Sequence, residues 1–123
     1  MPDHPDLIEL RDRMRRFTEE RDWSRFHDPK SLILALIGEV GELSELFQWL
    51  PADEALTKAK EQPLRARVEE EISDVLLYLV RLADVLEIDL GEAAARKQEA
   101  ASRKHEPGAE PTRFTIDAAT DAD

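Results

Sequence analysis

Four acidic side chains, arranged in two pairs, are the residues of this chain best suited to chemistry. Glu39 and Glu42 form one pair, and Glu71 and Asp74 form the other, each within an apolar segment. Residues three apart lie on one face of a helix, so each pair can direct two carboxylates to one spot. Two such helices packed together would place four mutually repelling groups around one cavity. A hard cation bound by oxygen ligands, Mg²⁺ or Mn²⁺, would relieve this repulsion.

A pair of acids on a helix usually belongs to a solvent-exposed face, but the composition of the segment from Leu32 to Leu50 favours a functional role. Its only charged residues are Glu39, Glu42 and Glu45, with no Lys or Arg to pair with them. Gly38 and Gly41 lie in its middle, where each costs about 1 kcal/mol relative to alanine. The glycines predict the close approach of another helix or a ligand. For Glu45 the sequence is equally compatible with a role in the site and with a solvent-exposed position.

Aromatic residues near these acids are candidates for ligand contacts. Tyr78 follows Glu71 and Asp74 on one helical stripe and could contact whatever the metal holds, or could be an ordinary half-buried tyrosine. Trp23 and Trp49 lie near polar connectors. Tryptophan in such places either covers the edge of a core or stacks on a base, and composition alone favours neither.

Composition restricts the class of protein. The 123 residues predict one domain with one modest core, and the formal charge of −11 argues against nonspecific binding to nucleic acid or anionic membranes. There is no cysteine, so disulfides and thiolate metal sites are excluded. The start of the chain does not read as a signal peptide, and the longest apolar run, 32–37, is too short to span a membrane. We expect a soluble, cytoplasmic protein.

Apolar periodicity predicts helices and no strands. The four main helices are expected at 5–22, 31–50, 64–86 and 90–104, with a further helical turn possible at 55–59. Asp3, Ser31 and Asp89 are the expected N-caps. In the helix at 64–86, the residues expected to face inward are Val68, Ile72, Val75, Leu76, Leu79, Val80, Ala83 and Leu86. The fold class is therefore all-α, a four-helix bundle over residues 1–106 with an acidic, flexible tail at 107–123. The central helices carry more apolar surface than a small bundle can bury, so we expect symmetric self-association.

The chain resembles the MazG-like nucleotide pyrophosphohydrolases, and within them the dCTP pyrophosphatase branch. The segments that carry the resemblance are ERDW (20–23), FH (26–27), LALIGEVGEL (34–43), LFQW (46–49), EEISDVLLYL (70–79), LAD (82–84) and IDL (88–90). The resemblance spans roughly residues 7–105. It implies a helical bundle that forms a dimer or a dimer of dimers, and cleavage of a nucleoside triphosphate between its α- and β-phosphates.

The resemblance also implies roles for individual residues. Mg²⁺ would be held by Glu39, Glu42, Glu71 and Asp74, and the base, in the dCTP branch, would be enclosed by Trp23, His27, Trp49 and Tyr78. Lys97 is the expected contact of the leaving pyrophosphate, together with Lys104. A carboxylate not fully engaged with metal, Glu42 or Glu45, would take the proton of the attacking water.

Two other functions compete with this interpretation. The same fold could serve as a non-catalytic nucleotide-binding or regulatory bundle, which turnover of triphosphates would distinguish. A di-iron carboxylate bundle is disfavoured because it needs Glu-x-x-His ligand pairs, and neither acidic helix has one.

The fourth helix departs from the pattern of the family that the chain resembles. Ala101 stands where relatives usually have asparagine, and His105-Glu106-Pro107 stands where they usually have Tyr-Pro. These differences affect the choice of base and the contacts to the sugar or the phosphates.

Overall fold

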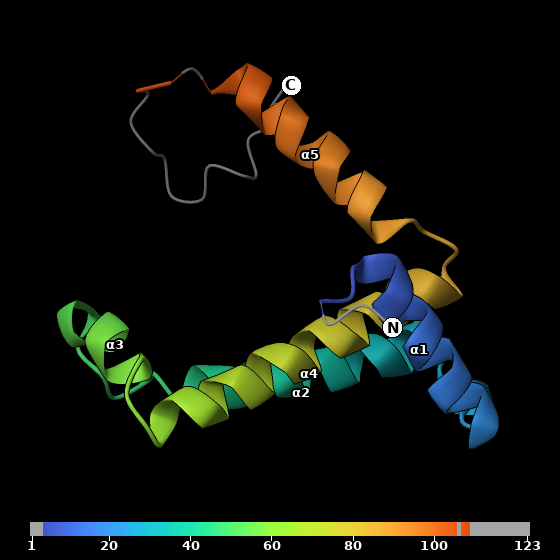
Figure 1. Cartoon of the computed structure of the whole chain (residues 1–123), viewed down its shortest axis with the longest axis horizontal. Helices are drawn as coiled ribbons and strands as arrows, with labels where there is room; N and C mark the ends of the chain where they lie inside the picture. The colour runs from blue at the N-terminus through green and yellow to red at the C-terminus, as the bar shows by residue number, and fades with distance from the viewer. Residues whose placement is uncertain (1–3, 106, 109–123) are drawn as a thin grey trace. The chain divides into compact units, whose positions relative to one another are not determined.

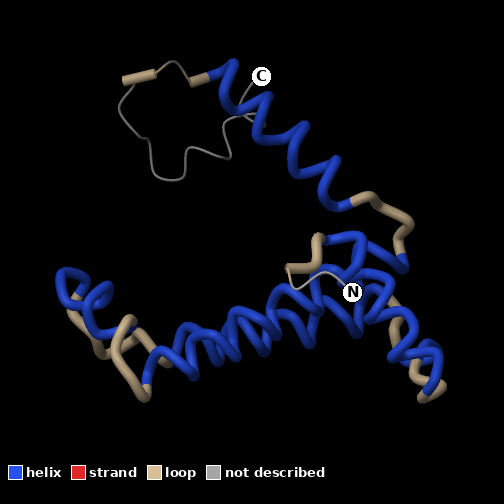
Figure 2. The backbone as a smooth tube through the Cα atoms, viewed as in Figure 1, coloured by secondary structure: helices blue, strands red, loops and turns tan. Residues whose placement is uncertain are grey.

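The structure is a computed structural model that describes residues 4–105, 107 and 108. Within these residues every regular element is helical, which confirms the all-α prediction (Figures 1 and 2). The elements are α1 (Leu7–Glu20), the 3₁₀ turn η1 (Ser24–Phe26), α2 (Pro29–Glu45), α3 (Ala52–Ala59), α4 (Leu64–Val85) and α5 (Leu90–Lys104). The turn expected at 55–59 is thus a complete helix, α3, which the four-helix prediction missed. The tail predicted at 107–123 lies almost entirely outside the described residues.

Aspartate side chains set the start of three helices. Asp6, Asp28 and Asp89 each accept a hydrogen bond from the backbone N–H three residues later, at 2.9, 2.9 and 3.0 Å. Such a cap satisfies one of the free N–H groups at the start of a helix. The prediction for Asp89 is confirmed. The cap of α1 is Asp6 rather than Asp3, which lies outside the described residues, and Ser31 donates to the Asp28 cap instead of acting as one.

The end of α2 also differs from the prediction. The helix stops at Glu45, and residues 46–50 continue as tight turns in which the N–H of Leu50 donates to the carbonyl of Phe47 at 2.9 Å. Pro51 follows directly, and the residue before a proline is disfavoured in helical conformation. The effect of Pro51 therefore reaches further back along the chain than the apolar periodicity indicated.

The chain divides into two compact units, one up to Glu87 and one from Ile88 onward. In the first unit α2 and α4 lie side by side and run in opposite directions, and α1 and α3 also contact α4 (Figure 1). The second unit contains α5 and is described by itself. Among the described residues, no helix combines the length and the apolar character needed to cross a membrane.

The core of the first unit is small. Its buried apolar side chains are Leu32, Val80 and Ala83. The prediction that Val80 and Ala83 face inward is confirmed. The same prediction is wrong for Ile72, Leu79 and Leu86, which are exposed, as is much of α2. Helical periodicity identifies an apolar face, but it does not identify what covers that face.

Candidate functional site

The structure brings three of the four predicted carboxylates together. Glu39 and Glu42 come from α2 and Glu71 comes from the facing side of α4. One oxygen from each carboxylate lies within 4.8 Å of those of the other two, a spacing that allows all three to bind one cation. The convergence follows from the i, i+3 spacing on α2 and from the antiparallel packing of α2 against α4.

The electrostatics of this group are unfavourable without a positive partner. The Oε2 atoms of Glu39 and Glu71 are both buried, and neither has a hydrogen-bond partner. Burial, followed by the proximity of Glu42, raises the pKa of Glu39 to about 7. Burial and the charge of Glu42 raise the pKa of Glu71 as well. Carboxylates that are crowded and stripped of water must bind protons or a cation, and an all-oxygen donor set fits a hard divalent ion.

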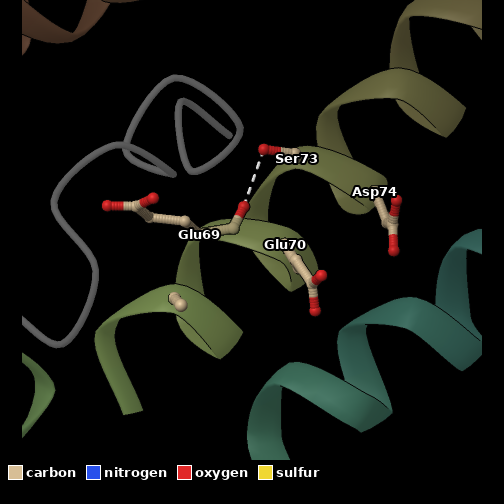
Figure 3. A pocket seen from close by; sticks show the side chains of 5 residues that line it. Glu69, Glu70, Ser73 and Asp74 are labelled. Atoms are coloured by element: carbon tan, nitrogen blue, oxygen red, sulfur yellow. Dashed lines mark hydrogen bonds between the residues drawn. The ribbon is translucent and has the colours of Figure 1, made fainter. Parts of the chain in front are cut away.

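Asp74 lies beside this group rather than within it. Its charge helps to raise the pKa of both Glu39 and Glu71, which places it at the edge of the same acidic site. Asp74 also lines an open pocket along α4 together with Ala66, Glu69, Glu70 and Ser73. Glu70 and Asp74 point to the same side of the helix there, whereas Glu69 points away (Figure 3). The acidic site therefore opens onto a surface that is itself acidic.

The two glycines of α2 do not have the neighbours that the sequence predicted. A Cβ atom added at Gly38 or Gly41 would meet nothing within 4 Å, so no other part of the described chain approaches them closely. The prediction that another helix approaches them closely is therefore wrong within the described chain, and the approach of a ligand stays a prediction. What the glycines provide is an open stretch of α2 immediately beside Glu39 and Glu42.

The aromatic candidates are spread over several elements. Trp49 lies in the turns after α2 and is 86% exposed, so its alternative role as a cover for the core is wrong for the single chain. Trp23 precedes η1 and packs edge-to-face on Phe17, with the ring centroids 5.4 Å apart. Tyr78 is half-buried on α4. Trp49 therefore offers the most accessible ring for stacking.

His27 is held in a network that the sequence did not reveal. Its Nδ1 accepts a hydrogen bond from Nε of Arg81 at 3.0 Å, and Nη1 of Arg81 donates to Asp84 at 3.1 Å. Arg15 of α1 donates to both carboxylate oxygens of Asp84. The available signal was a lone Arg, with Asp three residues later, in the apolar stretch YLVRLAD. Burial and the neighbouring charge of Arg81 lower the pKa of His27, while the hydrogen bond from Arg15 lowers that of Asp84.

The remaining candidates lie apart from the three-carboxylate group. Glu45 is exposed and is the last residue of α2, one turn beyond Glu42. Lys97 and Lys104 lie on α5, in the second unit, where Lys97 is half-buried and Lys104 is exposed. Their roles at the phosphates stay predictions.

Comparison with known proteins identifies the family. Residues 27–107, about two thirds of the chain, match the MazG nucleotide pyrophosphohydrolase domain. This match includes α2 and α4 with all four acids. The chain belongs to the MazG nucleotide pyrophosphohydrolase domain family.

Particular relatives are similar over most of this chain. It is 46% identical to dCTP pyrophosphatase 1 of Bos taurus over 101 residues, covering 82% of this chain and 60% of that protein. It is 45% identical to human dCTP pyrophosphatase 1, covering 82% of this chain and 59% of that protein. The chain thus spans about three fifths of the length of these relatives. A crystal structure of a pyrophosphatase from Archaeoglobus fulgidus superposes with a TM-score of 0.74 at 42% identity, covering 85% of this chain and 96% of that one.

Proposed function

We propose that this chain is a Mg²⁺-dependent nucleoside triphosphate pyrophosphohydrolase that cleaves dCTP, or a related modified pyrimidine deoxynucleotide, to the monophosphate and pyrophosphate. The observation that carries the proposal is the pair of buried carboxylate oxygens on Glu39 and Glu71, which have no partner in the protein. Family membership supports the reaction class, and the dCTP pyrophosphatases among the relatives support the base. Such an activity would remove unwanted nucleotides from the precursor pool.

Four residues would hold the metal in this proposal: Glu39, Glu42, Glu71 and Asp74. Three of them already converge, and the fourth borders them. When bound, Mg²⁺ would neutralise phosphate oxygens, orient the triphosphate and lower the pKa of a water molecule. The protein would supply a rigid set of acceptors on two packed helices, so little reorganisation would be needed when the substrate binds.

The proton of the attacking water needs an acceptor that is not occupied with metal. Glu42 belongs to the converging group, whereas Glu45 lies one turn further along α2, exposed and outside that group. We therefore assign the role of general base to Glu45 and that of ligand to Glu42.

Other side chains would bind the two ends of the nucleotide. Lys97, with Lys104, would contact the phosphates and stabilise the negative charge on the leaving pyrophosphate. Trp23, His27, Trp49 and Tyr78 would contact the base. Stacking of a base on an aromatic ring is favourable for every base, so the polar members of this set must provide the discrimination.

We also propose that the protein acts as a homodimer or a dimer of dimers, in which the exposed face of α2 is covered by a second copy. Leu34 and Ile37 on this face are 60% and 59% exposed, and Gly38 and Gly41 lie on it with open space above them. Glycines that follow apolar side chains on one helix face allow two helix backbones to approach closely. Few apolar residues are buried within the described part of the chain, which supports a contribution of assembly to stability.

A substrate panel tests the proposed function. The protein would be incubated with Mg²⁺ and each of the canonical ribo- and deoxyribonucleoside triphosphates and 5-modified dCTP, and products would be separated by ion-exchange chromatography. We expect monophosphate and pyrophosphate, formed fastest from a dCTP species. Binding of nucleotides without any turnover would instead support the non-catalytic bundle.

A further inference from the structure

Two arginines and an aspartate form a hydrogen-bonded chain that ends on His27. Arg15 of α1 donates to Asp84 through Nε at 3.0 Å and through Nη2. Arg81 donates through Nη1 to Asp84 and through Nε to His27 Nδ1, at 3.1 and 3.0 Å. The side chains of Arg81 and Asp84 are only 7% and 8% exposed. The buried carboxylate of Asp84 thus fixes the orientation of the Arg81 guanidinium group that contacts the imidazole.

This arrangement determines where His27 carries its proton. A guanidinium group only donates hydrogen bonds and does not lose its proton in proteins. Nδ1 of His27 must therefore present a lone pair to Arg81, and the neutral ring carries its single proton on Nε2. The neighbouring positive charge also opposes a second proton on the ring. His27 is consequently a neutral hydrogen-bond donor through Nε2.

The position of His27 relative to the acids fits a nucleotide. Glu71, Asp74, Tyr78 and Arg81 follow one another on α4 at steps of three, four and three residues, so they share one stripe of the helix. Asp74 and Arg81 are seven residues apart, about 10 Å along the helix axis. A nucleotide extends over a comparable distance from its α-phosphate to its base. His27 bonds to Arg81, at the end of this stripe farther from Glu71, so a nucleotide whose phosphates lie at the acids could extend its base toward the imidazole.

We propose that Arg81 is a positioning residue that fixes His27 as an Nε2–H donor to the base, and so selects cytosine. The inference rests on the proposed function, and Arg81 itself need not touch the substrate. Cytosine presents two neighbouring acceptors, O2 and N3, whereas N3 of thymine and uracil carries a hydrogen. A histidine fixed as an Nε2–H donor can bond to N3 of cytosine, whereas it meets the N3–H group of thymine or uracil. An unmatched polar group in a closed site is costly, so the fixed donor favours cytosine.

The tautomer is tested on the unmodified protein by ¹⁵N NMR of the imidazole nitrogens. The proposal predicts a pyridine-type signal for Nδ1 of His27 and a pyrrole-type signal for Nε2 from pH 6 to pH 8. In Arg81→Met the two tautomers should exchange and the signals should move toward each other. The opposite tautomer in the unmodified protein, or signals that Arg81→Met leaves unchanged, would overturn the proposal. This readout does not depend on turnover, so it separates a failure here from a failure of the proposed function.

Specificity is tested by a double-mutant cycle with His27→Ala, Arg81→Met and the combined variant. We expect each single change to lower the ratio of kcat/KM for dCTP over dTTP about tenfold, through KM, which is the effect of one hydrogen bond. The combined variant should lose little more than either single variant. Arg65→Met, which removes an exposed ion pair to Glu69 on the same helix, should leave the ratio unchanged. A merely structural network would reduce both substrates equally and leave the ratio intact, which would overturn the proposal.

Discussion

Glu39 of α2 and Glu71 of α4 face each other across the packed helices, and each keeps its Oε2 atom buried without a hydrogen-bond partner. Most buried polar atoms in proteins are paired, so two such oxygens in one place require an explanation. Their shared position beside Glu42 explains both, because a cation at this point would contact all three carboxylates. We therefore expect the folded protein to be less stable without a cation at this site.

The first prediction concerns the pH dependence of the metal-free protein. The pKa of Glu39 is raised from 4.5 to about 7 on folding, so between these values the folded state binds more protons than the unfolded chain. This contribution to stability is present below pH 4.5 and is lost as the pH rises toward 7. Glu39→Gln should therefore have a higher Tm than the metal-free protein at pH 8, and the two should converge near pH 5. Thermal unfolding in chelator measures this, and a difference that does not vary with pH would contradict it.

The second prediction concerns assembly. Gly38→Leu places a good helix former in open space on α2, so it should stabilise an isolated chain by about 1 kcal/mol. If a second copy covers this face, the same change should raise the dimer dissociation constant at least tenfold. Thr57→Ala on α3 is the control, because it improves helix propensity away from this face. Sedimentation velocity over a range of concentrations distinguishes the outcomes, and a stable, active monomer of the unmodified protein would refute the assembly proposal.

The pairing of the acids was predictable from the sequence, because i, i+3 spacing alone places Glu39 with Glu42 on one face. The contact between His27 and Arg81 was not predictable, since it joins residues 54 apart in the chain and depends on how α1, η1 and α4 pack. The exposure of Ile72 was also missed. Periodicity shows that such a residue belongs to an apolar face, and only the packed chain shows whether that face is covered.

The third prediction concerns Trp49. This residue is 86% exposed, so Trp49→Ala should change the stability of the single chain by no more than about 0.5 kcal/mol. Stacking on a base contributes about 1–3 kcal/mol, so KM for dCTP should rise roughly ten- to a hundredfold. Leu56→Ala, at another exposed apolar position on α3, serves as the control and should leave KM unchanged. A loss of Tm with an unaltered KM would show that Trp49 packs in the assembly instead of binding the base.

The fourth prediction separates the two candidate proton acceptors. Glu45→Gln should lower kcat by about 10²–10⁴-fold while leaving the affinity for Mg²⁺ unchanged, because its carboxylate is assigned to the water and not to the metal. Glu42→Gln should instead weaken Mg²⁺ binding. Titration with Mg²⁺, followed both by activity and by Tm, distinguishes ligand from base. Weaker Mg²⁺ binding in Glu45→Gln would reverse the assignment.

The most direct test of the central claim follows the products of dCTP by ³¹P NMR in the presence of Mg²⁺. The unmodified protein should yield dCMP and pyrophosphate, and Glu39→Gln, with an unchanged helical circular dichroism spectrum, should yield neither. Formation of dCDP and orthophosphate would place the cleavage at the wrong bond. Turnover by Glu39→Gln close to that of the unmodified protein at saturating Mg²⁺ would contradict the assignment of the acidic group as the metal site.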